Sequence, residues 1–308
     1  MSKDLRIIFL GTPDFAAASL KKLVENDINI VAVITAPDRP KGRGKKLGTS
    51  AVKDYAIEAG LTVLQPTNLK SPEFIDELKS YKADLQIVVA FRMMPEVVWN
   101  MPPLGTFNLH ASLLPQYRGA APINWAIING EQETGVTTFF LKHEIDTGEI
   151  IFQETEPIKE NDNVGSLYQR LMNKGADLVL RTVKAIESDD YPQEAQQGSS
   201  ELKTAPKIFK EDCKIDWSQN ANQIRDFVRG LSPYPAAWAR FEGKMLKVYE
   251  VERSTQNTGG SLGEIKVVGK NRLLVNVANG TMSILDLQIE GKRRMKVDEF
   301  LRGYQPLA

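Results

Sequence analysis

Apolar runs alternate with helical patterns along the first two-thirds of the chain. Short runs typical of buried strands lie at residues 5–10, 28–35, 62–65, 83–91 and 106–110. Stretches with helical spacing of apolar residues lie between them, at residues 14–24, 50–60 and 71–81. Because strands separated by helices are joined by right-handed crossovers, this order predicts a Rossmann-like α/β fold, a mostly parallel sheet covered on both faces. Thr12, as a hydroxyl cap, and Pro13, in the first turn, predict the start of the first helix.

The last third of the chain has a different pattern. A long helical pattern at residues 163–188 is followed by a polar stretch rich in Gln, Ser and Pro, which is typical of a linker. One further helix is predicted within residues 217–231, capped by Ser218. Five short alternating runs follow, at residues 236–241, 244–251, 263–268, 272–278 and 282–289. Strands at this spacing predict a small antiparallel barrel or sandwich, and we expect an OB-like β-barrel.

These patterns predict two domains. The first is the α/β domain at residues 1–189, the second is the antiparallel β-barrel domain at residues 206–308, and residues 190–205 form the linker. The turn after the first strand reads GTPDFA and lacks the G-x-G-x-x-G spacing of a dinucleotide site. A nicotinamide enzyme, the usual expectation for this architecture, is therefore not supported.

Composition adds several expectations. With 42% hydrophobic and 25% charged residues, the chain resembles an ordinary globular protein. The first apolar run is too short for a signal peptide and no run approaches the ~20 residues of a membrane helix, so we expect a cytoplasmic protein. Cys213, His110 and His143 are too few for a structural zinc site, and we expect neither a disulfide nor a metal. No long apolar stripe requires a dimer, so we expect a monomer.

The charge is unevenly distributed. The whole chain has a net charge of zero, but residues 206–308 carry 17 basic and 12 acidic side chains. This excess indicates a polyanionic partner for the second domain, although a chance excess on a solvated surface explains the count equally well.

Two polar side chains share one face at the end of the last strand of the first series. Asn108 and His110 alternate with Phe107 and Leu109, so the amide and the imidazole point to the same side. Ligands bind beyond the carboxyl ends of strands in such sheets. An amide beside an imidazole can donate two hydrogen bonds to a developing oxyanion, whereas the alternative is a satisfied structural histidine with a turn asparagine.

Residues 139–151 supply a carboxylate for this site. They read as a strand broken at D-T-G and then resumed. Asp146 at the break would approach His110 and hold its proton, although an aspartate beside a turn glycine is common without such a role. His143 is predicted to be a surface residue. The stretch SLLPQYRGAAP (112–122) is predicted to be a rigid loop that offers main-chain groups to a flat heterocycle.

These motifs resemble a known family. The pattern N-L-H-x-S-L-L-P-x-Y-R-G-x-x-P at residues 108–122, with the downstream D-T-G, is similar to the formyltransferases that use 10-formyltetrahydrofolate. The segments FLGTPDFA (9–16), APDRPKGRGKKL (36–47) and RGLSPYPAAW (229–238) resemble the branch whose acceptor is methionyl-tRNA. The resemblance covers essentially the whole chain, including the second domain.

The resemblance implies a function. The formyl group of 10-formyltetrahydrofolate, the co-substrate, would pass to the α-amino group of methionine on initiator methionyl-tRNA for translation initiation. The residues that match the family's catalytic triplet are Asn108, His110 and Asp146, and those that match its folate-binding segment are Ser112, Leu113, Leu114 and Pro115. Asn108 and protonated His110 would stabilise charge on the formyl oxygen, and Asp146 would keep His110 charged.

Two basic regions are predicted to bind the tRNA. Residues 37–46 carry five basic residues and one acidic residue, and are predicted to form a lid over the acceptor end through Arg39, Lys41, Arg43, Lys45 and Lys46. The predicted tRNA-binding residues of the second domain are Lys207, Lys210, Arg229, Lys292 and Arg293. A mobile solvated loop and a solvated surface are the alternatives.

Other functions stay open at this point. A sugar nucleotide or glycinamide ribonucleotide as acceptor would need neither basic region. A folate-dependent hydrolase would use the same three residues with water as the acceptor. A nucleic-acid-binding protein that has lost catalysis would have no reason to retain all three.

Overall fold

The computed structural model describes residues 4–41, 46–196 and 201–304. The chain forms two compact units. The first unit comprises residues 1–118, 135–156 and 169–203, and the second comprises residues 119–134, 157–168 and 204–308. The second unit therefore includes two segments that precede the predicted linker.

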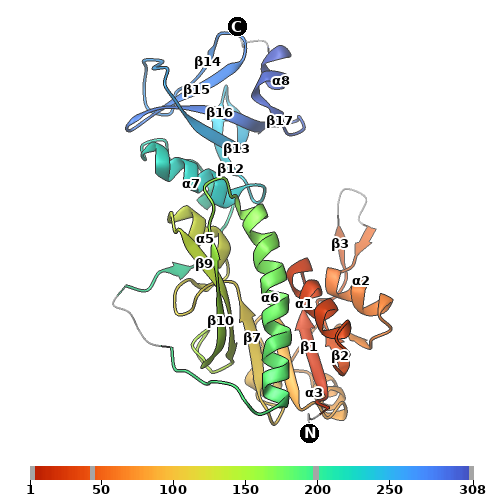
Figure 1. The fold of residues 1–308 in the computed structure, drawn as a ribbon. Coiled ribbons are helices and arrows are strands. Elements are labelled where there is room, and N and C mark those ends of the chain that lie inside the picture. Colours follow the sequence, from red (N-terminus) through yellow and green to blue (C-terminus); the bar gives the residue numbers. More distant parts are fainter. Residues whose placement is uncertain (1–3, 42–45, 197–200, 305–308) are drawn as a thin grey trace. The chain divides into compact units, whose positions relative to one another are not determined.

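A seven-stranded sheet forms the centre of the first unit (Figure 1). Its strands, in spatial order, are β10 (Ile150–Pro157), β9 (Glu133–Phe140), β7 (Thr106–His110), β6 (Leu85–Val89), β1 (Ile7–Gly11), β2 (Ile30–Ile34) and β5 (Val63–Leu64). The strands from β7 to β5 are parallel, and β9 is antiparallel to β7, which confirms the predicted mostly parallel sheet. Residues 139–151 are the end of β9, a turn and the start of β10, and the prediction of a single interrupted strand was wrong.

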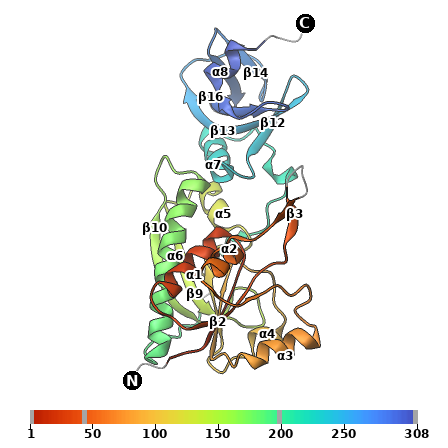
Figure 2. The same cartoon turned by 90° about the vertical axis from the view of Figure 1, so that its right-hand side faces the viewer.

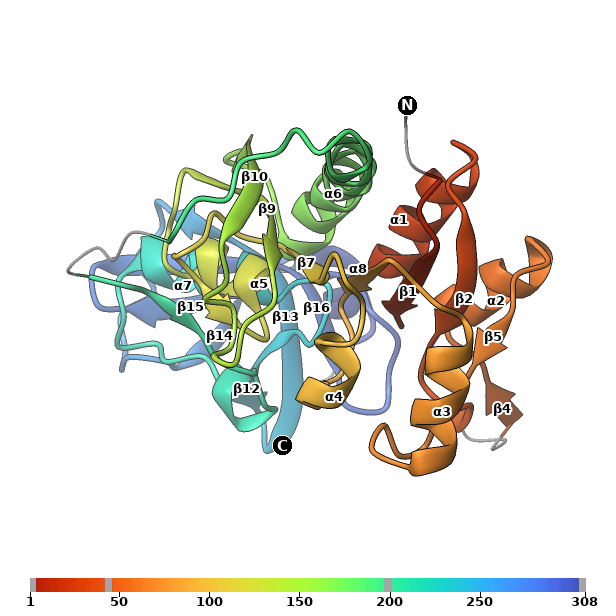
Figure 3. The ribbon, with the colours of Figure 1, turned by 90° about the horizontal axis from the view of Figure 1, so that it is seen from below.

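Helices cover both faces of this sheet (Figure 3). Helices α1 (Asp14–Val24) and α6 (Val164–Glu187) lie on one face, and α3 (Pro72–Ser80) and α4 (Glu96–Trp99) lie on the other. Helix α2 (Ala51–Glu58) packs against α1 and β5. The core beneath α3 and α4 contains Ile8, Leu10, Ala32, Ile34, Phe74, Leu78, Val88 and Val98. Because both faces are covered, the central strands are apolar throughout rather than alternating.

The basic region at residues 37–46 includes a β-hairpin that the sequence did not predict. Strand β3 (Arg39–Lys41) pairs antiparallel with β4 (Lys46–Gly48). The base of the hairpin is anchored by Asp38, which accepts hydrogen bonds from Lys53 Nζ at 2.5 Å and from Gln65 Nε2 at 2.8 Å. These two hydrogen bonds lower the pKa of Asp38, so the carboxylate stays charged and continues to hold the hairpin.

An antiparallel sheet forms the centre of the second unit. Its main strands, in spatial order, are β12 (Ala237–Phe241), β13 (Lys244–Ser254), β16 (Gly280–Ile289), β15 (Arg272–Val277) and β14 (Ile265–Val268). These are the five predicted strands, and β17 (Met295–Lys296) also pairs with β16. Among the described residues the pairing runs from β12 to β14 as an open path, so the expected barrel does not close through hydrogen bonds.

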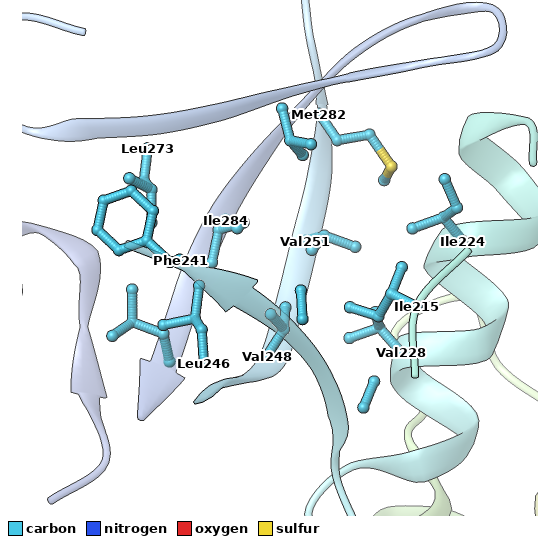
Figure 4. Close-up of a cluster of buried hydrophobic side chains, with 14 of the residues drawn as sticks. Ile215, Ile224, Val228, Phe241, Leu246, Val248, Val251, Leu273, Met282 and Ile284 are labelled. Atoms are coloured by element: carbon cyan, nitrogen blue, oxygen red, sulfur yellow. The ribbon is translucent and has the colours of Figure 1, made fainter. Parts of the chain in front are cut away.

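Helices complete the core of the second unit. Ile224 and Val228 of α7 (Ala221–Leu231) belong to the same buried cluster as Leu246 and Ile284 of the sheet (Figure 4). Helix α8 (Val297–Arg302) lies beside β16 (Figure 2) and also packs against β15. The remaining elements are α5 (Pro122–Ile128), which packs against α7, the 3₁₀ helix η1 (Glu211–Cys213), and the short strands β8 (Arg118–Gly119) and β11 (Thr204–Ala205).

Both predicted helix caps were wrong. Helix α1 begins after Pro13, which itself occupies the cap position, and Thr12 therefore lies outside the helix. Helix α7 is capped by Asn220, whose side chain accepts a hydrogen bond from a backbone N–H of the first turn. Ser218 instead donates its hydroxyl to Asp216 Oδ1 at 2.6 Å. No helix among the described residues combines the length and apolar character that a membrane crossing needs.

Candidate active site

Asn108 and His110 lie at the carboxyl end of β7, on the face of the sheet opposite α6. Leu109, which alternates with them, points to the other side, where Gly175 of α6 approaches it so closely that a Cβ at position 175 would lie 2.8 Å from Leu109 Cδ2. The register pairs Asn108 with Val88, which belongs to the core on the α3 and α4 side. The predicted alternation therefore holds, and the amide and the imidazole share a face.

His110 is buried, and both of its ring nitrogens face polar groups. Nε2 lies 2.9 Å from the backbone carbonyl oxygen of Tyr117, and Nδ1 lies 3.9 Å from Asp146 Oδ2. Because a carbonyl oxygen can only accept, Nε2 must carry a hydrogen and donate it to Tyr117. A hydrogen bond from His110 to a substrate oxygen therefore has to come from Nδ1, on the side of Asp146.

The structure brings Asp146 to His110 as expected. The two side chains are only 12% and 7% exposed, so little water screens the pair. At 3.9 Å the two atoms are too far apart for a direct hydrogen bond, and one polar atom lying between them can contact both.

The backbone of the D-T-G turn explains its sequence. Asp146 has a φ of +54°, a left-handed conformation that aspartate tolerates better than most residues. Gly148 lies so close to β9 that a Cβ there would be 1.5 Å from the carbonyl oxygen of Phe140, so only glycine fits. Thr147 donates its hydroxyl to the carbonyl of Glu144 at 3.0 Å. The sequence of the turn therefore determines its backbone conformation, and that conformation fixes the position of the Asp146 carboxylate.

The amide of Asn108 is half-buried and makes no hydrogen bond to other described residues. A half-buried amide at the ligand-binding edge of a parallel sheet can donate to a bound molecule.

The loop at residues 112–117 is held by two residues that the sequence did not single out. Thr137 of β9 donates to the carbonyl of Ser112 at 2.7 Å and accepts from the backbone N–H of Leu114 at 3.2 Å. Gln153 of β10 donates to the carbonyl of Leu114 at 2.8 Å. Thr137 and Gln153 each lie within a strand. In the sequence each is only a polar residue in or beside an apolar run, so neither was identified as part of the site.

The predicted folate-binding residues differ in exposure. The side chains of Ser112 and Leu114 are buried, and the Ser112 hydroxyl donates to the carbonyl of Gln116 at 2.6 Å. Leu113 and Pro115 are half-buried. A ligand at this loop would therefore contact the latter two side chains, whereas Ser112 and Leu114 shape the loop from within.

Three exposed apolar side chains lie on the segment that follows β6 and on the turn between β9 and β10 that carries Asp146. Met93 is 77% exposed, Ile145 is 61% exposed and Val97 is 50% exposed. The segment of Ile145 lies against α4, because His143 Nε2 is 3.2 Å from Glu96 Oε1. Exposed apolar groups beside a polar site are typical of a ligand-binding surface.

His143 is a surface residue, as predicted. Its side chain is 75% exposed, and its ring packs edge-on against Trp99 with 5.5 Å between the ring centroids. In the described ranges, no group of three or more His, Cys, Asp or Glu side chains is arranged to hold a metal ion.

The basic residues predicted to bind tRNA fall into different classes. Lys207, Lys210 and Lys292 are exposed, and none forms an ion pair with another described residue. Arg293 is paired with Glu299. Arg229 is only 14% exposed and donates to Asp226 Oδ1 at 2.8 Å and to two backbone carbonyls, so its guanidinium is used inside the unit, which argues against the prediction that it binds tRNA.

The hairpin residues are described only in part. Arg39 is exposed at the start of β3. Lys41 and Lys46 are paired through the backbone of β3 and β4. Arg43 and Lys45 lie outside the described residues.

The segment KRRMK (292–296), the densest basic run, is largely neutralised by acidic neighbours. Arg294 donates two hydrogen bonds of 2.9 Å to Asp286, and Lys296 lies 2.6 Å from Glu250 and 3.3 Å from Asp286. Burial alone would raise the pKa of Asp286, but the hydrogen bond from Arg294 and the charges of Arg294 and Lys296 outweigh it and lower that pKa.

Replacing Asp286 with Asn should destabilise the second unit by about 1 to 3 kcal/mol at pH 7, because it removes charged hydrogen bonds. The pKa of Asp286 is lower in the folded state than in the unfolded state. The stabilisation is therefore complete at pH values above the unfolded-state pKa, and it is lost as the pH falls through the folded-state pKa. Urea unfolding of both proteins at pH 7 and below about pH 4 checks this, and the difference should shrink in acid. A difference that grew on acidification would contradict the assignment.

Comparison with known proteins identifies the family. The family described as formyl transferase matches residues 5–183, and its C-terminal domain matches residues 207–305. The chain belongs to the formyl transferase family. The family resemblance inferred from the motifs is therefore confirmed.

Relatives of this family cover nearly the whole chain. A methionyl-tRNA formyltransferase of Bacteroides fragilis is 56% identical over 310 residues, covering 98% of this chain and 96% of that protein. A methionyl-tRNA formyltransferase of Phocaeicola vulgatus is 58% identical over 313 residues, covering 98% of this chain and 97% of that protein.

Solved structures share the fold at lower identity. HypX from Aquifex aeolicus in complex with tetrahydrofolic acid matches with a TM-score of 0.65 and 21% identity over 97% of this chain, which spans 47% of the length of HypX. The sugar 3N-formyl transferase WlaRD matches with a TM-score of 0.66 and 20% identity, covering 94% of this chain and 100% of that one. At this identity, the likeness concerns the fold alone.

Proposed function

We propose that this chain transfers the formyl group of 10-formyltetrahydrofolate to the α-amino group of methionine on initiator methionyl-tRNA. The observation that carries the proposal is the approach of Asp146 to the buried His110 at the carboxyl end of β7, where Asn108 offers an amide. The full-length relatives named methionyl-tRNA formyltransferase support the choice of acceptor.

The residues present fit the co-substrate. The Asn108 amide has no hydrogen bond to other described residues, and the exposed apolar side chains of Met93, Val97 and Ile145 suit a flat heterocycle. 10-Formyltetrahydrofolate supplies a formyl carbon that an amine attacks, with departure of N10. The new bond joins the methionine nitrogen to the formyl carbon, and the bond from that carbon to N10 breaks.

Each residue of the triplet has a distinct task. Asn108 donates a hydrogen bond to the formyl oxygen, where negative charge develops, and His110 donates a second one from Nδ1. Asp146 lies beside Nδ1 and accepts the proton that the attacking amine loses. The same proton is then delivered to N10, so the site is restored after each turnover.

The proposed tRNA surface uses the cations that have no acidic partner among the described residues. In the second unit these include Lys207 and Lys210, which precede and border η1, together with Lys292. Phe209 lies between the first two, is 56% exposed and has the Lys207 ammonium 5.2 Å from its ring centroid. Exposed ammonium groups beside an exposed aromatic ring suit phosphate and base contacts. We include the hairpin residues Arg39, Lys41, Arg43, Lys45 and Lys46 in the same proposal.

Replacing both Lys207 and Lys210 with Gln should weaken tRNA binding and flatten its salt dependence. The slope of log Kd against log salt should fall by about 0.7 to 0.9 for each phosphate that the variant no longer neutralises. The matched control is Lys270→Gln, an exposed lysine of the same unit at the turn before β15. Filter binding at several salt concentrations measures the slopes, and equal slopes for the two variants would contradict this surface.

An acceptor panel tests the proposed function. Purified protein is given 10-formyltetrahydrofolate with methionyl-tRNA, free methionine, an amino-sugar nucleotide, glycinamide ribonucleotide or no acceptor. Tetrahydrofolate and the formylated product are both measured. We expect one formylmethionyl-tRNA for each tetrahydrofolate released and at most slow transfer to the small acceptors. Formate release that does not need tRNA would instead indicate a hydrolase.

We further propose that the protein works as a monomer in the cytoplasm, where translation initiation takes place. Light scattering coupled to gel filtration, with and without tRNA, tests the first point. A mass near that of the 34.4 kDa chain is expected for the free protein.

A further inference from the structure

The side chain of Gln196, which lies in the predicted linker, uses its whole hydrogen-bonding capacity. Its Nε2 donates to the carbonyl oxygens of Asp146 and Gly148, each at 2.8 Å. Its Oε1 accepts from Arg118 Nε at 3.1 Å and from Arg118 Nη2 at 2.5 Å. Only an amide side chain of this length has two donor hydrogens and an acceptor on one plane, so the set of partners is specific for glutamine.

The amide nitrogen of Gln196 holds the D-T-G turn through its two hydrogen bonds. The two carbonyls that it binds flank Thr147 and belong to the backbone that sets the position of the Asp146 carboxylate. Asp146 has a left-handed φ, a conformation that persists only when surrounding contacts support it. The hydrogen bonds from Gln196 are such contacts.

The amide oxygen of Gln196 binds Arg118 and so holds the segment that contacts His110. Arg118 directly follows Tyr117, whose carbonyl oxygen accepts the hydrogen bond from His110 Nε2. The backbone N–H of Tyr117 donates to the carbonyl of Lys203 at 2.7 Å. Lys203, which like Gln196 belongs to the predicted linker, therefore also supports the segment of Tyr117 and Arg118. Gln196 thus bridges the two segments that position the two members of the His110–Asp146 pair.

The chain around Gln196 is itself attached to the sheet. Glu194 and Ile150 exchange two backbone hydrogen bonds of 2.8 and 3.0 Å, which place this stretch beside the start of β10. In Figure 3 the chain after α6 crosses to the outer side of β10. The stretch from Glu194 to Gln196 is therefore part of the first unit and is not a free linker between domains.

We infer that Gln196 is a positioning residue for the His110–Asp146 pair: it sets the 3.9 Å approach of the carboxylate to Nδ1 by clamping the D-T-G turn to Arg118. This inference rests on the proposed function, since it assigns a rate effect to a residue that does not contact the reacting atoms. The competing explanation is that Gln196 only fixes the path of the chain, which would affect stability but not the chemical step.

Two variants and one control test the inference in the full-length protein. Gln196→Ala removes both ends of the clamp. Gln196→Glu keeps an acceptor for Arg118 but has no hydrogen to donate to the carbonyls of Asp146 and Gly148. Gln193→Ala is the matched control, because Gln193 is exposed on the same stretch and its side chain makes no hydrogen bond to other described residues.

We expect both Gln196 variants to lower kcat about 10- to 100-fold, with KM values for folate and tRNA within about twofold of wild type. The control should match wild type. In an Asp146→Asn background, Gln196→Ala should lower the remaining rate by less than about twofold, because the carboxylate that it positions is already gone.

Three results would overturn the inference. One is that Gln196→Ala and Gln193→Ala give the same kcat. Another is that Gln196→Glu keeps wild-type kcat, since the hydrogen bonds to the turn would then be unnecessary. The third is that Gln196→Ala shows its full loss in the Asp146→Asn background while lowering the midpoint of thermal unfolding. Failure of the wild-type protein to make formylmethionyl-tRNA would instead refute the proposed function.

Discussion

Replacing His110 with Asn should lower kcat for formyl transfer by about 10²- to 10⁴-fold. Asparagine can place an uncharged amide near the position of Nδ1, beside Asp146, but its side chain is too short to reach the Tyr117 carbonyl that Nε2 contacts. The variant therefore loses the hydrogen bond that orients the ring, and the imidazole donor to the formyl oxygen is replaced by an uncharged amide. The KM values should change much less, because this donor acts mainly on charge that develops during the reaction.

His143→Asn is the matched control for this experiment. It makes the same chemical change at the other histidine, which is 75% exposed. Its kcat should stay within about twofold of wild type, as for most surface substitutions. Turnover of the His110 variant within a few-fold of the control would show that the imidazole does not take part.

Asp146→Asn should cost a similar factor, about 10²- to 10⁴-fold in kcat, because it removes the carboxylate that we propose as the acceptor of the amine's proton. Asparagine has nearly the same shape and also tolerates the left-handed φ of +54°, so the D-T-G turn should keep its conformation. The loss would then report the charge and not a distorted turn. Steady-state kinetics with methionyl-tRNA measures it.

Asp189→Asn is the control for this second variant. Asp189 also has a left-handed φ, of +55°, but it is exposed on the turn after α6. The control should leave kcat unchanged. If the Asp146 variant kept more than about a tenth of wild-type kcat, the carboxylate would have no part in proton transfer.

The sequence predicted the sheet, and it singled out the three candidate residues, for clear physical reasons. Strands buried on both faces read as continuous apolar runs, so β1, β2, β6 and β7 were evident. Asn108 and His110 stood out because polar residues are rare at the end of such a run. Asp146 was singled out because D-T-G interrupts a strand pattern, and the structure explains the glycine, since a Cβ at position 148 would collide with the backbone of β9.

The interactions that support the triplet were not predictable in the same way. Gln196 lies 50 residues from Asp146 and 78 residues from Arg118 in the chain, and nothing local marks it as different from its neighbour Gln193. Thr137 and Gln153 likewise act across strands. Such interactions depend on which segments the fold brings together, which a pattern of local propensities does not encode.

The charge pattern misled in one respect. The densest basic run, KRRMK at residues 292–296, reads as a nucleic-acid contact when counted alone. In the folded unit Asp286, Glu250 and Glu299 neutralise most of it. Lysines that are sparse in sequence, such as Lys207 and Lys210, are among those without an acidic partner in the described part of the chain.

The central claim is that an amide, an imidazole and a carboxylate act together on one formyl group. Single-turnover formyl transfer by Asn108→Ala, with saturating folate and methionyl-tRNA, tests it most directly, since Asn108 has no hydrogen bond to other described residues that its loss would disturb. Asn100→Ala, which alters an exposed asparagine after α4, is the control. We expect a rate about 10²- to 10³-fold below wild type, as for the loss of one oxyanion donor. A rate within threefold of the Asn100 control would contradict it.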